Sequence, residues 1–303
     1  MSDARKIREE VSTAYAKAVT RGSSCCDSGV TAETVSDQVD AGAQADDSRT
    51  PRRTKGVAAS FAGYTEEELA ELPEGAVENS FGCGNPLAFS EVREGDTVVD
   101  LGSGAGIDLL IAARAVGPEG RVIGVDMTDE MITKARAHVA EAGVTNVEVR
   151  KGLIEELPIE SGTADWVISN CVINLSPEKE HVFAEIARVL KPGGRMQVSD
   201  IVVEGLPDWM RESAGLYSAC IGGAVSEKEY LAGLSSAGLV EVEVKDRLVY
   251  EASQIAGIVE SELPDALEKL TKDGVPLGRE QLRTLAGSVE GKVMSLKIAA
   301  RKA

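Results

Sequence analysis

Histidine is almost missing from this chain, whose 303 residues include only His138 and His181. We expect both to lie on the surfaces of helices, and their scarcity argues against a histidine-rich metal site. The five cysteines include no pair with CxxC spacing, so a zinc ribbon has no support either. Their odd number argues against a framework of structural disulfides.

Long apolar runs and an excess of positive charge are missing as well. No apolar run approaches the ~20 residues that a membrane helix needs, and residues 1–10 are charged, without the apolar core of a signal peptide. The formal net charge is −18, which opposes contact with phosphate backbones. We therefore expect a cytoplasmic protein that has no nucleic-acid partner and no membrane partner.

What the chain does contain is an alternation of strand-like and helix-like segments that begins near residue 95. Residues 3–21 also predict a helix, because apolar side chains recur at helical spacing, and residues 27–56 have the composition of a mobile linker. Alternating strands and helices predict a doubly wound, mostly parallel Rossmann-like α/β sheet, with an appended C-terminal α+β subdomain. We expect strands at 97–101, 121–126, 147–150, 166–169, 195–203, 239–245 and 293–300, and helices at 107–116, 129–142, 177–190, 226–237 and across most of 252–288.

A glycine-rich loop follows the first strand of this alternation. The sequence Asp100-Leu101-Gly102-Ser103-Gly104-Ala105-Gly106 ends the strand and leads into a helix. Glycines let the backbone come close to a ligand, and the start of the helix offers free N–H groups. In an open α/β sheet, ligands bind at this edge.

Two ligands are compatible with such a loop. A dinucleotide-binding loop has the spacing GxGxxG, whereas here the spacing is GxGxG and Ile107 stands in place of the last glycine. The carboxylate of Asp100 would repel a pyrophosphate but would help to hold the ammonium group of a methionine moiety. The loop therefore favours S-adenosylmethionine, and a glycine turn that binds no ligand is the alternative.

A second acidic residue, Asp126, ends the second strand about twenty residues after the loop. A carboxylate at this position can accept hydrogen bonds from both ribose hydroxyls. Met127 follows and could pack on the adenine. The alternative role of Asp126 is to cap the next helix, although Thr128 and Asp129 are also available for that.

Residues 97–203 resemble a class I S-adenosylmethionine methyltransferase, through the glycine loop, Asp126 and the turn Leu190-Lys191-Pro192-Gly193-Gly194. The resemblance implies that Leu153 and Ile154 lie beside the adenine, although both could simply be core residues. We expect the chain to divide into an N-terminal helix with a cysteine pair and linker (1–60), the methyltransferase domain (61–245) and a C-terminal subdomain (246–303). The expected cofactor-binding residues are Asp100, Gly102, Ser103, Gly104, Gly106, Asp126, Met127, Leu153, Ile154 and Asn170.

Three cysteines fall where loops of this fold meet the ligand. Cys171 ends the fourth strand, Cys220 lies in the insertion after the fifth, and Cys83 lies in a loop before the domain. Soft thiolates bind thiophilic centres, and three converging sulfurs suit trivalent arsenic. Composition and spacing leave inert, unrelated thiols as an equal alternative.

Together, the segments around these cysteines resemble the arsenite methyltransferase family. They are Cys25-Cys26, Phe81–Pro86, Ser169–Leu175 and Cys220–Ala224. The resemblance implies that Cys171 and Cys220 bind arsenic, with Cys83 as the third thiol. It also implies that Cys83 with Cys25 or Cys26 takes part in binding or in disulfide exchange, with thioredoxin or glutathione as the reductant.

The sequence is also compatible with two other functions. One is methyl transfer to a carbon or oxygen of a small metabolite, because the Lys191–Gly194 turn also occurs in such enzymes. The other is a non-catalytic protein that binds a metalloid through its thiols. The intact loop and Asp126 argue against a protein that only binds, since it would need no cofactor site.

Overall fold

The computed structural model describes residues 2–21, 64–70, 72–80, 82, 84–87, 90–211, 216–217, 220–252, 271–272, 275–276, 284, 286–287 and 289–303. Cys25, Cys26 and Cys83 lie outside these residues, as does most of the helical stretch predicted at 252–288.

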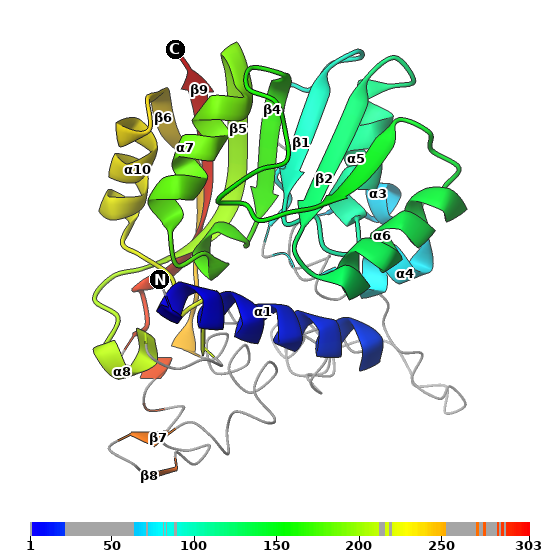
Figure 1. Ribbon diagram of the computed structural model, residues 1–303. Coiled ribbons are helices and arrows are strands. Elements are labelled where there is room, and N and C mark those ends of the chain that lie inside the picture. The colour runs from blue at the N-terminus through cyan, green and yellow to red at the C-terminus, as the bar shows by residue number, and fades with distance from the viewer. Residues whose placement is uncertain are drawn as a thin grey trace, which may run out of the picture.

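A seven-stranded sheet forms the centre of the molecule, in the order β3-β2-β1-β4-β5-β9-β6 (Figure 1). The first five strands in this order pair in parallel, whereas β9 is antiparallel to both of its neighbours. The predicted α/β class is therefore confirmed. The strands are β1 (Thr97–Leu101), β2 (Arg121–Asp126), β3 (Val147–Lys151), β4 (Ala164–Asn170), β5 (Leu190–Val203), β6 (Leu239–Val249) and β9 (Val293–Lys302), with a separate pair β7 (Thr271–Lys272) and β8 (Val275–Pro276).

Helices cover both faces of the sheet because successive side chains of a strand point to opposite sides. In β1, Val98 packs in one cluster with residues of α5 and α6, whereas Val99 packs in another with residues of α7 and α10. Both valines are fully buried, so each face has its own apolar core. The helices are α5 (Ile107–Val116), α6 (Asp129–Glu141), α7 (Lys179–Val189), α10 (Glu227–Ser236), and the shorter α3 (Glu66–Ala70), α4 (Glu74–Glu78), η2 (Ile173–Leu175) and α8 (Asp208–Arg211).

Helix α1 (Ser2–Arg21) confirms the predicted N-terminal helix and crosses the carboxyl ends of the parallel strands (Figure 1). Its neighbour is α6, which follows β2. The first helix in the chain is thus brought to the edge of the sheet at which the glycine loop ends β1.

Several local predictions differ from the structure. Helix α7 begins at Lys179 rather than at Pro177, since Glu178 is its N-cap. The strand β5 begins at Leu190, so the predicted turn at 190–194 is part of it, with an irregular register against β4. His138 is buried rather than on the surface, and its Nδ1 lies 2.8 Å from the carbonyl oxygen of Ala105.

The predicted boundary before the C-terminal subdomain falls within the main sheet. The boundary at residue 246 falls inside β6, and β9 lies between β5 and β6 in the main sheet. The strand β9 therefore belongs to the main sheet, and the division of the chain into three parts stays a prediction. Among the described residues, no helix is both long enough and apolar enough to span a bilayer.

Candidate donor and thiol site

The glycine loop turns sharply between β1 and α5. The φ of Gly102 is 67° and that of Gly106, the N-cap of α5, is 96°, and both values favour glycine. A Cβ on Gly102 would come within 2.4 Å of the Val172 side chain. The loop therefore touches the residue next to Cys171, which links the predicted donor site to the predicted thiol site.

Asp126 holds the loop from the neighbouring strand. Its Oδ2 accepts a hydrogen bond of 3.0 Å from the Gly104 N–H, and its Oδ1 accepts one of 2.8 Å from the Thr128 N–H. Burial raises the pKa of Asp126, and these backbone hydrogen bonds oppose the rise. The carboxylate is thus both a fixed part of the loop and, at 9% exposure, close to the surface of the pocket.

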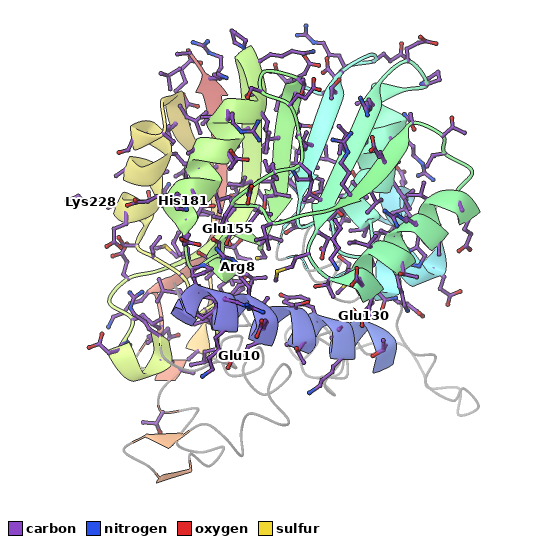
Figure 2. All side chains as sticks on the ribbon, in the orientation of Figure 1. Arg8, Glu10, Glu130, Glu155, His181 and Lys228 are labelled. Atoms are coloured by element: carbon purple, nitrogen blue, oxygen red, sulfur yellow. The ribbon has the colours of Figure 1, made fainter. Side chains whose placement is uncertain are left out.

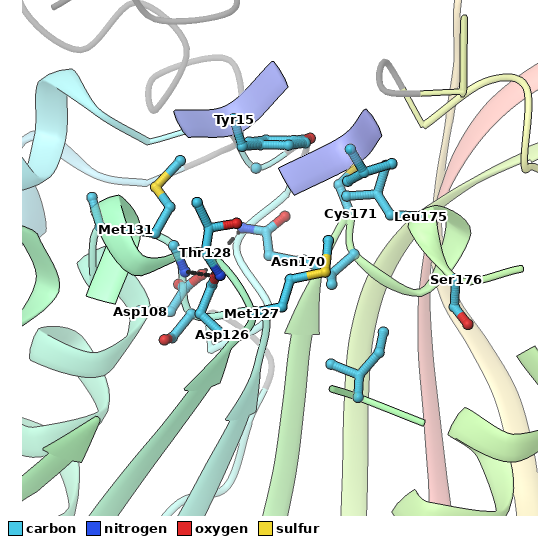
Figure 3. A pocket seen from close by; sticks show the side chains of 18 of the residues that line it. Tyr15, Asp108, Asp126, Met127, Thr128, Met131, Asn170, Cys171, Leu175 and Ser176 are labelled. Carbon is cyan, nitrogen blue, oxygen red and sulfur yellow. Dashed lines mark hydrogen bonds between the residues drawn. The ribbon is translucent and has the colours of Figure 1, made fainter. Parts of the chain in front are cut away.

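A pocket opens at this edge of the sheet, and Figure 3 shows its interior. Of the predicted cofactor-binding residues, Gly102, Ser103, Gly104, Asp126, Met127, Ile154 and Asn170 line it, and Cys171 does so as well. The other three do not. Asp100 is buried at the end of β1, Gly106 caps α5, and Leu153 bridges to Glu156.

Buried carboxylates surround the loop and make the site suited to a cation. Burial raises the pKa of Asp100 well above its ordinary range, and the nearby charges of Asp108 and Asp126 raise it further. Its Oδ2 has no hydrogen-bond partner among the described residues. An ammonium or sulfonium group nearby would relieve this repulsion, so the residues fit a donor that carries both.

Asp108 lines the pocket as well, although it was not predicted from the sequence. The Tyr64 hydroxyl donates a 2.6 Å hydrogen bond to its Oδ1, and Asn170 Nδ2 lies 3.3 Å from its Oδ2. Burial raises the pKa of Asp108 to about 6, although these two donors lower it. The position of Asp108, two residues after the last glycine of the loop, is the sequence feature that could have identified it.

Asn170 connects the pocket to the segment around Cys83. Its Oδ1 accepts a 3.1 Å hydrogen bond from the Gly84 N–H, and its Nδ2 donates to the Gly84 carbonyl. A Cβ on Gly82 would clash with the Asn170 side chain. The glycines on both sides of Cys83 therefore lie against the residue that precedes Cys171.

Cys171 and Cys220 are brought together from distant parts of the chain. The Cys220 thiol donates a hydrogen bond of 2.8 Å to the carbonyl oxygen of Cys171, and both residues belong to one buried cluster. Cys171 takes part in a disulfide bond, and Cys220 does not. Both have left-handed backbone conformations, with φ of 58° and 62°, which are uncommon for residues other than glycine.

The turns that carry these two cysteines are fixed to each other. A Cβ on Gly223 would come within 2.0 Å of the Asn174 carbonyl oxygen, so the turn after Cys220 lies directly on the turn after Cys171. In the described part of the chain, no three side chains of His, Cys, Asp or Glu are placed to hold a metal ion. A site with three thiols stays a prediction, since Cys83 is outside that part.

A buried acid and a buried amine lie behind the cysteine turns. Asp200 accepts hydrogen bonds from Asn174 Nδ2 (2.8 Å) and the Tyr230 hydroxyl (3.1 Å). Burial raises the pKa of Asp200 to about 7, against the attraction of Lys179. Burial also lowers the pKa of Lys179 to about 8.

The variant Asp200→Asn should therefore flatten the dependence of stability on pH. Because the pKa of Asp200 is higher in the folded than in the unfolded chain, its stabilising contribution is complete below about pH 4. That contribution is lost as the pH rises to about 7, by up to about 1.4 kcal/mol per pH unit. Urea unfolding at pH 5 and pH 8 measures the difference, with exposed Asp208→Asn as the control. Parallel stability curves for the two variants would contradict the expectation.

Sequence comparisons agree with this geometry. A family model described as a methyltransferase domain matches residues 93–238. The arsenite methyltransferase of Halobacterium salinarum is 42% identical over 243 residues, covering 80% of this chain and 59% of the relative. The human arsenite methyltransferase is 37% identical over 176 residues, covering 55% of this chain and 46% of the relative. The chain thus spans about half the length of these curated relatives.

A solved structure extends the similarity over more of both chains. The arsenic (III) S-adenosylmethionine methyltransferase from Chlamydomonas reinhardtii is 32% identical to this chain, with a TM-score of 0.60. The match covers 78% of this chain and 71% of the algal one. On this similarity, the chain belongs to the arsenite S-adenosylmethionine methyltransferase family.

Proposed function

We propose that this protein transfers a methyl group from S-adenosylmethionine to trivalent arsenic held by cysteine thiolates. The observation that carries the proposal is the 2.8 Å contact between the Cys220 thiol and the Cys171 carbonyl, beside a pocket that Cys171 shares with the glycine loop. Relatives that are named arsenite methyltransferases support the same substrate.

The donor would be held by the residues that line the pocket. Asp126 would accept hydrogen bonds from the ribose hydroxyls, Met127 and Ile154 would contact the adenine, and the buried acids Asp100 and Asp108 would favour the cationic amino-acid end. When bound, S-adenosylmethionine supplies an activated methyl group on a sulfonium. The chain therefore needs to position an acceptor and needs no general base for the transfer.

The acceptor would be held by Cys171 and Cys220, with Cys83 as the third thiol. Each thiol that replaces a hydroxide of arsenous acid forms an As–S bond, and its proton leaves with that hydroxide as water. Arsenic in this site keeps its lone pair, which the thiolates would direct toward the pocket. Orientation of this kind contributes several kcal/mol to lowering a barrier. The contacts of Gly82 and Gly84 with Asn170 and Ser199 support the inclusion of Cys83.

The thiols also offer a route for returning arsenic to the trivalent state. Methylation makes arsenic formally pentavalent. A second thiol that attacks the arsenic-bound sulfur of Cys83 would close a disulfide, break that As–S bond, return two electrons to arsenic and release one proton. Cys83 with Cys25 or Cys26 is the proposed pair, and thioredoxin or glutathione would reduce it again.

The proposal is tested by following the turnover of the donor. With S-adenosylmethionine, arsenite and a thiol reductant, the protein should form S-adenosylhomocysteine and methylated arsenic in equal amounts, and neither without arsenite. Product formation with a quinone or lipid precursor but not with arsenite would favour a metabolite methyltransferase instead. Tight binding of arsenite without any turnover would favour a protein that only binds the metalloid.

A further inference from the structure

Helix α1 forms a wall of the pocket, although it is far in sequence from the other lining residues, which run from Asn79 to Ser176. Arg8, Val11 and Tyr15 line the pocket from one side of this helix. In Figure 3 the ring of Tyr15 lies across the pocket from Asp126, the predicted ribose contact. A ligand held by Asp126 and the glycine loop would therefore be covered by α1.

Apolar and polar contacts attach the helix to the rest of the domain. Val11 and Val19 are 1% and 0% exposed, so both lie on the face of the helix that packs against the domain. The Ser12 hydroxyl lies 3.2 Å from the hydroxyl of Thr128, the residue that donates its N–H to Asp126. Contacts of α1 thus reach the same short segment that binds the glycine loop.

A partly buried ion pair also attaches the helix, through Arg8. Its Nε donates a 3.0 Å hydrogen bond to Glu155 Oε1, and its Nη2 donates to Glu178 Oε2. The side chains of Arg8 and Glu155 are only 19% and 7% exposed. Figure 2 shows Arg8 directed toward Glu155, whereas Glu10 lies on the other side of the helix.

Glu155 gives this ion pair a connection to the pocket. The same Oε1 atom accepts a 2.7 Å hydrogen bond from the Ser176 hydroxyl, and both Glu155 and Ser176 line the pocket. Loss of Arg8 would leave the buried Glu155 carboxylate without its charged partner, which is costly. By contrast, the pair formed by Arg5 and Glu9 on the same helix is 83% and 64% exposed, and such pairs contribute little.

We propose that α1 is a removable wall of the donor site, with Arg8 as the positioning residue that seats it. The seated helix covers the bound donor, and it lifts to admit S-adenosylmethionine and to release S-adenosylhomocysteine. The inference rests on the proposed function, because it takes the pocket to be the donor site. It assigns to the N-terminal helix a role in retaining the donor.

The experiment compares Arg8→Met with Arg5→Met in the full chain, using S-adenosylhomocysteine as the probe. Arg8→Met should weaken binding by roughly tenfold, mostly through faster dissociation, and Arg5→Met should bind like the wild type. Hydrogen exchange adds a measurement that a purely structural role would not affect. Bound S-adenosylhomocysteine should slow amide exchange along residues 5–20 in the wild type, and much less in Arg8→Met.

The outcomes separate this inference from the proposed function. A wild-type protein that does not bind S-adenosylhomocysteine would refute the donor site itself. Wild-type affinity in Arg8→Met, or exchange in α1 that does not respond to the ligand, would refute only the role of the helix. If Arg8→Met fails to fold, Arg8→Lys keeps the charge but loses the two-pronged contact. Its affinity should lie below that of the wild type, and equal affinity would overturn the inference.

Discussion

Serine in place of either Cys171 or Cys220 should lower the rate of arsenite methylation by at least about a hundredfold. A serine hydroxyl does not ionise near neutral pH, and its hard oxygen binds trivalent arsenic far more weakly than a thiolate does. With one of the two sulfurs gone, arsenic would no longer be held with its lone pair toward the pocket. The assay measures methylated arsenic formed under saturating donor and thiol reductant.

Serine is a better replacement than glycine at both positions, because serine has the same unfavourable left-handed backbone conformation there as cysteine. Both residues have left-handed φ values, so glycine would relieve strain and change the turn as well as the thiol. Binding of S-adenosylhomocysteine to Cys220→Ser is the control, since Cys220 does not line the donor pocket. Full activity in both variants, with donor binding intact, would remove arsenic as the proposed acceptor.

The backbone conformation of these two cysteines is a second sign that they belong to a functional site. A residue other than glycine in the left-handed region costs about 1–3 kcal/mol, and this chain accepts the cost at both positions. The close contact between Gly223 and Asn174 holds the two turns in this conformation. Strained residues cluster at functional sites. The backbone conformation of these two cysteines therefore supports a role in binding, and this support does not depend on the chemistry of sulfur.

The central part of the fold was predictable because its rules are local. Strands buried on both faces, such as β1 and β2, appear in the sequence as short apolar runs, and the turn between β1 and α5 needs glycines. The position of β9 was not predictable in this way. Its pairing with β5 and β6 joins residues about 50 to 100 positions apart, and apolar alternation carries no information about which strand a segment will join.

The candidate site was predictable only where topology determines it. Asp126 is the last residue of β2 and Cys171 directly follows β4, and the ends of parallel strands meet at one edge. Asp100 and Leu153 were expected in the pocket, but Asp100 is buried behind it and Leu153 does not line it. Arg8 and Tyr15 were missed because their place above the pocket depends on how a distant helix packs, which the spacing of its apolar residues does not specify.

The variant Asp126→Ala should weaken binding of S-adenosylhomocysteine by at least about a hundredfold. Two hydrogen bonds from ribose hydroxyls to a carboxylate would be lost, and hydrogen bonds to charged groups contribute about 1.5–3 kcal/mol each. The same change removes the acceptor for the Gly104 and Thr128 N–H groups. The glycine loop would therefore be less well ordered even before the ligand binds.

The matched control is Asp129→Ala, three residues further along the chain. The Asp129 side chain is 71% exposed and pairs with Lys151 at 2.7 Å, and a surface pair of this kind contributes little to stability. Calorimetric titration of both variants separates the ribose contact from a general effect of lost negative charge. Equal affinities would mean that Asp126 serves only to hold the loop. In that case the variant should still unfold at lower urea concentration than the wild type, because two buried N–H groups would have lost their acceptor.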